Sequence, residues 1–289
     1  MMKRRDGSIV ETGGGQDRLL GTLYGSVWGR ALLRPLTAPW LSHLAGRFLS
    51  TRLSCFLIKP FIRKNNIDMQ PYEKGPYRSY NEFFSRKIRS GMRPIDMDES
   101  HFIAPCDSKL TVLPITGDCR FELKHTWYTV ESLLKDKALA DRYTGGLALI
   151  FRLTVDDYHR YCYACDGEKE PGVHIPGVFH TVNPIANDYY PIYKENTREY
   201  SILHTREFGD ILMMEVGALL VGRIVNHHEK ATVTRGQEKG YFQFGGSTVV
   251  LLVQKDRLTV DSDLAENSSA NIETIVRMGE KIGCTSQSE

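Results

Sequence analysis

The sequence predicts an α+β protein, in which a β-rich, mostly antiparallel body follows an amphipathic helical N-terminal segment. Three observations support this fold class. Between residues 17 and 65, apolar residues recur at steps of three and four, as in a helix with one apolar face. After residue 100, the apolar residues form short runs that are often β-branched. Turn signals such as Gly145-Gly146 and Gly245-Gly246 separate these runs and favour antiparallel strands.

Length and composition are those of an ordinary globular protein. The chain has 289 residues, of which 41% are hydrophobic and 25% charged, so it can bury a sizeable core in one or two domains. No run of 18 apolar residues predicts a transmembrane helix, and the first 20 residues lack the apolar region of a signal peptide.

The six cysteines are too scattered for a disulfide framework, so we expect reduced thiols in a reducing compartment. The run of His159, Cys162 and Cys165 reads H-x-x-C-x-x-C, which could hold zinc if a fourth ligand came from elsewhere. No second C-x-x-C completes such a site, and we predict no metal.

Three regions follow one another along the chain. Residues 1–16 are predicted to be a flexible tail, because three consecutive glycines occupy 13–15. Residues 17–75 are predicted to be a helical segment at a membrane interface, and residues 76–289 the catalytic domain. Within that domain one helical stretch is expected over Val130–Ala140. Candidate strands are Leu110–Ile115, Ala148–Leu153, Ile211–Met214, Ala218–Val225, Ala231–Thr234 and Thr248–Val253.

Charge is unevenly distributed. Residues 1–64 hold 11 Lys and Arg against 3 Asp and Glu, whereas the remainder holds 26 against 32. A basic leader on an acidic body indicates an anionic partner, either nucleic acid or an anionic membrane. Aromatic residues such as Trp40, Phe48 and Phe56 lie among the basic ones, as in interfacial helices. The alternative is a pair of helices that covers the core and exposes its basic residues to solvent.

Several catalytic motifs are absent. Gly245-Gly246-Ser247 resembles a nucleophile elbow, but Val249 stands where G-x-S-x-G requires glycine. The sequence has no phosphate-binding P-loop, no dinucleotide-binding glycine motif after a strand and no H-E-x-x-H. Nucleotide hydrolysis, dinucleotide binding and zinc proteolysis thereby lose most of their support, and no recognisable nucleic-acid module accompanies the basic leader.

Three segments remain that could supply chemistry. Asp107 lies in a turn before a strand, His159 lies in D-Y-H-R after the run LALIFRL, and Ser247 begins an apolar strand. Such residues can form an Asp–His–Ser triad. Spacing alone is a weak indication, because a turn aspartate, a capped histidine and a strand serine explain the same residues.

The local sequences around these residues resemble those of the phosphatidylserine decarboxylases, a family of pyruvoyl enzymes. The resemblance covers Tyr80 to Gly283 and rests on F-G-G-S-T-V-V-L-L, D-Y-H-R and the P-x-D turn, in which Asp107 stands. It extends through S-Y-N-E-F-F-S-R-K-I-R, R-P-I-D, V-N-P-I, N-T-R-E-Y-S-I, E-V-G-A-L-L-V-G-R-I and M-G-E-K-I-G.

The resemblance implies that the chain processes itself. The Ser247 hydroxyl would attack the Gly246 carbonyl, and the chain would separate into residues 1–246 and 247–289, with Ser247 becoming a pyruvoyl group. His159 would be the base that deprotonates Ser247, and Asp107 would orient His159. The pyruvoyl carbonyl would then form a Schiff base with the substrate amine and accept the electrons released with CO2. His159 would afterwards protonate the carbanion.

The implied reaction converts phosphatidylserine to phosphatidylethanolamine on a membrane, and we expect the enzyme at the cytoplasmic face of the cell membrane. Its expected partners are an anionic phospholipid surface and its own cleaved small chain, not nucleic acid; a homo-oligomer stays open. A phosphate headgroup needs cationic donors, and Lys74–Arg93 holds six basic residues against one acid, Glu82. The alternatives are a soluble pyruvoyl-dependent aromatic amino-acid decarboxylase of the same superfamily and an inactive lipid-binding relative.

Two positions depart from the family pattern. Ser108 stands where glycine often follows the motif aspartate, and Cys162 stands where many members have a second histidine. These departures put substrate choice and proton transfer in question.

Overall fold

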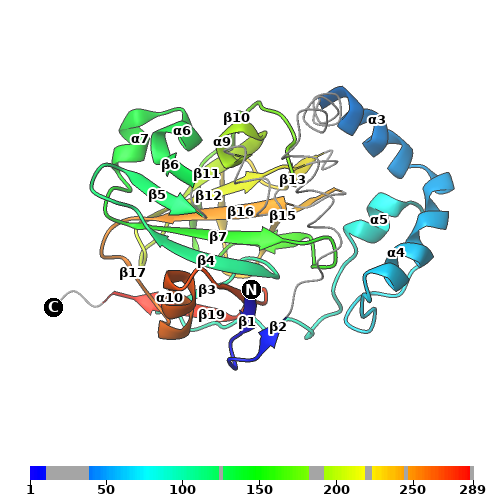
Figure 1. Ribbon diagram of the computed structural model, residues 1–289, viewed down its shortest axis with the longest axis horizontal. Coiled ribbons are helices and arrows are strands. Elements are labelled where there is room, and N and C mark those ends of the chain that lie inside the picture. The colour runs from blue at the N-terminus through cyan, green and yellow to red at the C-terminus, as the bar shows by residue number, and fades with distance from the viewer. Residues whose placement is uncertain (11–38, 124–125, 182–191, 219–222, 244–246, 287–289) are drawn as a thin grey trace.

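The computed structural model describes residues 1–10, 39–123, 126–181, 192–218, 223–243 and 247–286 (Figure 1). Its largest sheet confirms the predicted β-rich, mostly antiparallel body: of its strand pairs in the described residues, only β1–β18 is parallel. In spatial order the sheet runs β14 (Ala231–Val233), β9 (Gly167–Lys169), β11 (Arg198–His204), β12 (Asp210–Val216), β16 (Ser247–Val253), β7 (Leu147–Leu153), β4 (Ser108–Pro114), β18 (Glu273–Val276), β1 (Met2–Arg4) and β2 (Ile9–Val10), and β10 (Val173–Ile175) pairs with β11.

Three smaller sheets complete the body. They comprise β13 (Ile224–Asn226), β15 (Glu238–Phe242) and β8 (Arg160–Cys162); β17 (Leu258–Val260), β19 (Lys281–Thr285) and β3 (His101–Ile103); and β5 (Arg120–Leu123) with β6 (Thr126–Thr129). The helices of the body are α5 (Tyr80–Phe84), α6 (Val130–Leu134), α7 (Lys137–Asp141), α9 (Ile192–Glu195) and α10 (Ser262–Ser269).

The centre of the large sheet is formed by β7 and β16. Both are mostly apolar, apart from Arg152 in β7 and Ser247 and Thr248 in β16, and every residue of β16 is buried, as expected for strands covered on both faces. They pair antiparallel, with Ser247 opposite Leu153. The start of β16 and the end of β7 therefore lie at the same edge, and so does the start of β4, where Lys109 pairs with Arg152.

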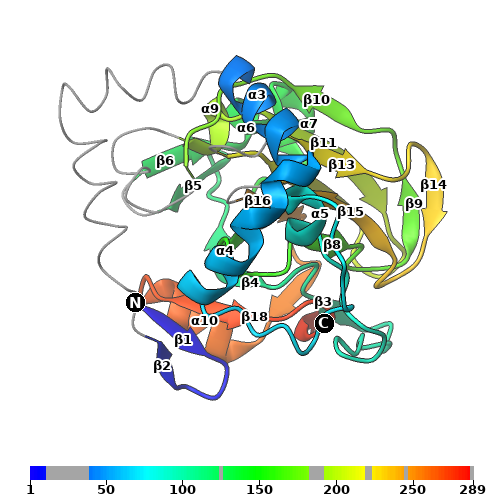
Figure 2. The same cartoon turned by 90° about the vertical axis from the view of Figure 1, so that its right-hand side faces the viewer.

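The helices of residues 39–64, the leader helices, lie at this end of the sheet. The helix α3 (Pro39–Leu49), the 3-10 helix η1 (Arg52–Leu57) and α4 (Ile58–Lys64) form a row in front of α5 (Figure 2). Their inward apolar residues, including Leu49 and Phe61, pack with Phe83 and Phe84 of α5 in a second core cluster. None of the helices in the described residues has the length and hydropathy needed to cross a bilayer.

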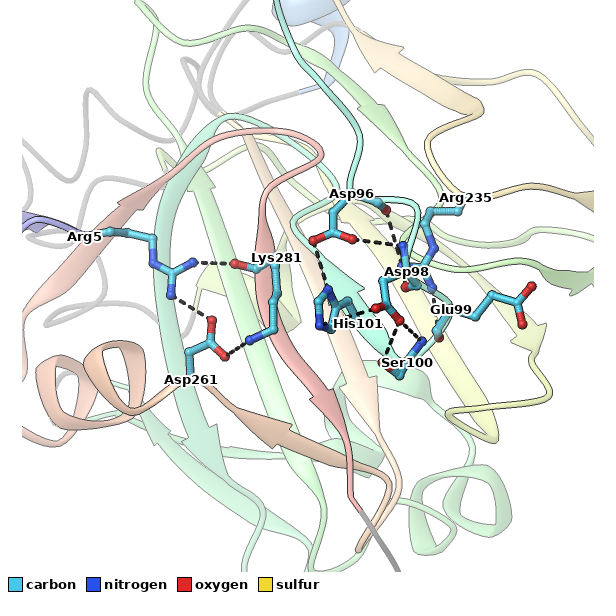
Figure 3. A network of polar contacts seen from close by, with 9 residues as sticks. All are labelled: Arg5, Asp96, Asp98, Glu99, Ser100, His101, Arg235, Asp261 and Lys281. Carbon is cyan, nitrogen blue, oxygen red and sulfur yellow. Dashed lines mark hydrogen bonds and ion pairs between the residues drawn. The ribbon is translucent and has the colours of Figure 1, made fainter.

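The expected flexible tail does not hold for residues 1–10. They form β1 and β2, and Arg5 donates hydrogen bonds to Asp261, Asp263 and the carbonyl of Lys281. Figure 3 shows Arg5 and Lys281 converging on Asp261, beside a network in which Arg235 donates to the carbonyls of residues 96, 98 and 99. Asp261 and Asp263 lie more than 250 positions from Arg5 in the sequence, so local composition could not predict these contacts. Residues 11–16, with the three glycines, lie outside the described residues.

Two further expectations need correction. The expected strand Ala218–Val225 is shorter, because Ala218 lies outside any strand and β13 begins at Ile224, with residues 219–222 outside the described part. The expected helix Val130–Ala140 is two short helices, α6 and α7, since Lys135 between them has a positive φ of 57°. Helix α10 was not predicted, because only Leu264 and Ser268 are buried in a polar sequence.

Candidate active site

A buried serine and a buried histidine meet at the edge of the sheet where β16 begins. Ser247 Oγ lies 3.5 Å from Nδ1 of His159, and both residues are fully buried. The strand register brings Ser247 to this edge, and His159 lies in the loop that joins β7 to β8. The distance is at the outer limit of a hydrogen bond, and such contacts between nucleophile and base commonly shorten during reaction. The structure thus brings two of the three predicted catalytic residues together.

Its surroundings keep His159 in the neutral form. Burial lowers the pKa of its imidazole well below the usual 6.5, and the nearby positive charges of Arg86 and Lys109 lower it further. Hydrogen bonds with the backbone of Thr154 and Val155 act in the opposite direction. The imidazole is therefore neutral at pH 7, and its Nε2 has no hydrogen-bond partner among the described residues.

Asp107 lies at the same edge but has other partners. Its carboxylate accepts hydrogen bonds from Nε of Arg93 at 2.9 Å and from the backbone N–H of Met278 at 2.9 Å. No hydrogen bond joins it to His159 within the described part of the chain. Strands in a sheet are about 4.8 Å apart, and β7 separates β4 from β16. This spacing explains why Asp107, just before β4, does not reach Ser247. The predicted role of Asp107 in orienting His159 has no direct contact to support it.

A different aspartate shapes the histidine loop. Asp157 accepts hydrogen bonds from the backbone N–H and the hydroxyl of Thr154, which close the turn after β7. Its carboxylate also pairs with Nζ of Lys109 at 2.6 Å. Both residues are mostly buried, so this ion pair fixes the D-Y-H-R loop against β4. Sequence reasoning did not assign roles to Asp157 or Lys109, although Asp157 is the first residue of D-Y-H-R and Lys109 lies two residues after Asp107.

The face of His159 is covered by α5. The ring of Phe84 stacks on the imidazole, with centroids 4.0 Å apart. Ser79 caps this helix by accepting from the N–H of Glu82. The cation-rich segment Lys74–Arg93 therefore includes the helix that contacts the histidine.

The two departures from the family pattern are both buried. Burial raises the pKa of the Cys162 thiol to about 12, so it is protonated at neutral pH and cannot act as the base that histidine would be there. Ser108 Oγ lies 3.4 Å from the carbonyl of Cys106, within its own turn. Within the described part of the chain, neither side chain forms a hydrogen bond with His159 or Ser247.

Comparison with known proteins places this chain in a class of enzymes. A family model described as Phosphatidylserine decarboxylase matches residues 80–284, and this family consists of carboxy-lyases. "Phosphatidylserine decarboxylase proenzyme 2" of Clostridium acetobutylicum is 48% identical over 91% of this chain and 90% of its own length. "Phosphatidylserine decarboxylase proenzyme" of Clostridium novyi is 39% identical over 92% of each chain, and that of Fusobacterium nucleatum is 36% identical over 98% of this chain and 96% of its own.

The chain belongs to the phosphatidylserine decarboxylase family. The predicted family resemblance is thereby confirmed, and the family model covers residues 80–284. The relatives' names describe proenzymes, which is consistent with a chain that is cleaved into two pieces.

Proposed function

We propose that this protein is a proenzyme that cleaves itself between Gly246 and Ser247 and then converts phosphatidylserine to phosphatidylethanolamine and CO2. The observation that carries the proposal is the buried contact of Ser247 Oγ with a neutral His159 imidazole, 3.5 Å apart. A serine hydroxyl is a weak nucleophile unless an adjacent base accepts its proton. His159 is the base that the site offers.

The proposed cleavage balances as follows. His159 takes the hydroxyl proton while Ser247 Oγ attacks the carbonyl carbon of Gly246. His159 then gives that proton to the nitrogen of residue 247 as the peptide C–N bond breaks, which leaves an ester and a free amine. Elimination then transfers the Cα proton of residue 247 to the neutral His159 and breaks the Cβ–Oγ bond, which releases the Gly246 carboxylate and leaves a Cα=Cβ double bond in residue 247. Hydrolysis of that residue with one water releases ammonia and leaves the pyruvoyl group.

The surroundings of Ser247 fit such a group. Once bound at residue 247, the pyruvoyl carbonyl would supply an electron sink for decarboxylation. β16 is hydrogen-bonded to β12 on one side and β7 on the other, so it would hold the new terminus rigidly. His159, at this terminus, would hold and return a proton at Nδ1. Phe84 stacked on the imidazole helps to exclude water from it.

The small piece would remain part of the enzyme. Besides β16, residues 247–289 include β18, which pairs with β4 and β1, and β19, which pairs with β3. The fragment is therefore built into two sheets through backbone hydrogen bonds with residues 1–246.

The membrane surface is the proposed site of action, at the cytoplasmic face of the cell membrane. The leader helices expose Leu53 and Phe56, which are 76% and 67% accessible, and also Leu44 and Phe48. Five cations are exposed on the same helices: Arg47, Arg52, Lys59, Arg63 and Lys64. Apolar residues beside cations are what an interfacial helix needs on an anionic bilayer. The side chain of Trp40, and all of Trp28, lie outside the described part.

Turnover by the purified protein tests the proposal. Vesicles of phosphatidylserine should yield phosphatidylethanolamine and CO2 without added pyridoxal phosphate, and borohydride with substrate present should attach the amine to the 247–289 piece. Equal or better turnover of free aromatic amino acids would instead identify the soluble decarboxylase. A full-length, unprocessed protein without turnover would identify an inactive relative.

A further inference from the structure

Arg86 is a buried cation with unused hydrogen-bond donors. Arg86 lies two positions after the end of α5, and the residue is 2% exposed. Nη1 lies 3.4 Å from the carbonyl of Phe83, whereas Nε and Nη2 have no hydrogen-bond partner among the described residues. A buried guanidinium without an anion is strongly destabilising, and guanidinium groups that are mostly buried are therefore normally paired.

The unused edge has the geometry for a bidentate anion. Nε and Nη2 form one edge of the guanidinium, and Arg152 and Arg93 use this same edge to bind carboxylates. Arg152 donates from Nε and Nη2 to Glu273 at 2.8 and 2.7 Å. Arg93 donates from the same two nitrogens to the carboxylate of Asp107. Carboxylates and phosphates are the groups that this fork fits.

Aromatic rings hold the guanidinium of Arg86 in place. Its Cζ lies 4.1 Å from the centroid of Tyr72 and 4.9 Å from that of Phe83. A cation stacked between rings loses little further freedom when it binds a ligand. The fork is thus prepared before any anion arrives.

This fork lies beside the candidate catalytic histidine. Phe83 is adjacent to Phe84, which stacks on His159, and the Tyr72 ring is 6.1 Å from that of Tyr158, the residue before His159. The charge of Arg86 is also close enough to contribute to the lowered pKa of His159. An anion on Arg86 would therefore lie near the reacting end of the substrate.

We propose that Arg86 binds the phosphodiester of the substrate headgroup. This inference rests on the proposed function and deepens it. Of the six cations in Lys74–Arg93, Lys74, Arg78, Lys87 and Arg89 are exposed, and Arg93 holds Asp107. Only Arg86 in this segment combines burial with an unused fork.

The substrate carries a second anion, the carboxylate that leaves as CO2. A cation paired with that carboxylate would stabilise a charge that disappears in the transition state, which slows the reaction. The phosphodiester keeps its charge throughout. Arg86 would then contribute to binding equally in the ground and transition states, and its loss should raise KM more than it lowers kcat.

The test compares Arg86→Gln and Arg86→Lys with the wild type, and Lys87→Gln serves as the control because it removes an exposed cation from the same segment. On phosphatidylserine in detergent micelles, Arg86→Gln should raise KM roughly 10- to 100-fold, as expected for a lost charge-assisted bidentate contact, with kcat within about threefold. Lys87→Gln should behave as the wild type.

A binding measurement provides a readout that needs no turnover. Calorimetry should show that glycerophosphoethanolamine binds the wild type and binds Arg86→Gln more weakly by the same factor, whereas ethanolamine, which lacks phosphate, does not distinguish them. If the wild type fails to decarboxylate phosphatidylserine but this difference in binding is found, the proposed function is wrong and the anion site stands.

Two results would overturn the inference alone. The first is an active wild type with KM and glycerophosphoethanolamine affinity unchanged in Arg86→Gln. The second is an equal loss of ethanolamine binding and kcat, which would place Arg86 at the amine end. If Arg86→Gln does not fold or cleave itself, Arg86→Lys decides: it keeps the charge but lacks the fork, so KM and affinity equal to the wild type would contradict the proposal.

Discussion

Arg5 at the start of the chain donates a hydrogen bond of 2.8 Å to Asp261, which lies in the small piece that self-cleavage would produce. Arg5 also donates to Asp263 at 2.9 Å. The N-terminal residues therefore hold residues of the small chain by the ion pairs of Arg5 as well as by the β1–β18 pairing.

We expect the two pieces to co-elute in size-exclusion chromatography and to separate only in denaturant. In an uncleaved Ser247→Ala background, Arg5→Gln should lower the free energy of unfolding by about 1–2 kcal/mol, as for partly buried charged hydrogen bonds. Urea denaturation measures this. Arg4→Gln is the control, because the exposed side chain of Arg4 donates to Ser8 in its own turn, and a comparable loss there would argue against a specific role of Arg5.

The lowered pKa of His159 predicts how self-cleavage depends on pH. The folded state disfavours the protonated imidazole, so the neutral base persists at pH values well below 6.5. The cleavage rate of freshly translated chain should thus stay level from pH 8 to below 6.5. A fall with a midpoint near 6.5 would show that His159 titrates normally or is not the base.

The same shift has a consequence for stability. Below pH 6.5 the histidine of the unfolded chain binds a proton that His159 of the folded chain does not bind. The free energy of unfolding therefore has its full value above pH 6.5 and falls as the pH drops towards the lowered pKa of folded His159. In a Ser247→Ala background, His159→Phe should weaken this pH dependence, which urea denaturation at pH 7.5 and 5.5 can measure. An unchanged dependence would assign it to other groups.

The Arg93–Asp107 pair should act as one unit. Both side chains are mostly buried, and removal of one partner leaves the other charge unpaired. Arg93→Gln and Asp107→Asn should each lower the free energy of unfolding by about 3–5 kcal/mol in a Ser247→Ala background. The double variant should lose less than the sum, and its deviation in urea denaturation measures the coupling. Additive losses would show that the contact does not couple these residues.

If Asp107 supports self-cleavage only by fixing the edge of the sheet, Arg93→Gln should slow cleavage as Asp107→Asn does. Normal cleavage in Arg93→Gln with none in Asp107→Asn would restore the direct role of Asp107 predicted from the sequence.

The exposed leader cations predict salt-sensitive binding to anionic vesicles. Replacing Arg47, Arg52, Lys59, Arg63 and Lys64 with Gln should greatly reduce sedimentation with such vesicles while leaving self-cleavage intact, because each cation near the surface contributes on the order of 1 kcal/mol. Wild-type binding should weaken with salt without vanishing, since Leu53 and Phe56 are not screened.

The matched control replaces the same number of exposed cations on the body, namely Lys135, Lys137, Arg206, Lys230 and Lys255. If this variant loses vesicle binding as the leader variant does, binding depends on net charge and not on the leader.

The sequence alone predicts those parts of the structure that depend on local patterns of residues. The apolar runs of β7 and β16 predict their strands, because a strand buried on both faces is mostly apolar. Ser247 and His159 were found through family motifs, and the strand register explains why they meet. The segment Lys74–Arg93 was identified by its charge, but only the fold shows that Arg86 is buried and Arg93 paired.

Contacts between distant segments could not be predicted. The partners of Arg5 lie at Asp261 and Asp263, and Asp107 is held by Arg93 and Met278, not by His159. Helix α10 has too few buried apolar residues for a helical pattern, and the Ser268 hydroxyl that accepts from the N–H of Val112 helps to hold it on β4. Such pairings depend on tertiary geometry and leave no local periodicity.

Intact-mass analysis of the purified protein tests the central claim most directly. Self-cleavage at Ser247 should replace the 32.9 kDa chain by pieces of 246 and 43 residues, and the smaller should begin with a pyruvoyl group that blocks its N-terminus. Ser247→Ala should remain in one piece and be inactive, since no hydroxyl can attack or become the cofactor. A wild-type protein that stays at 32.9 kDa, or a small piece that begins with a free serine amine, would contradict the account.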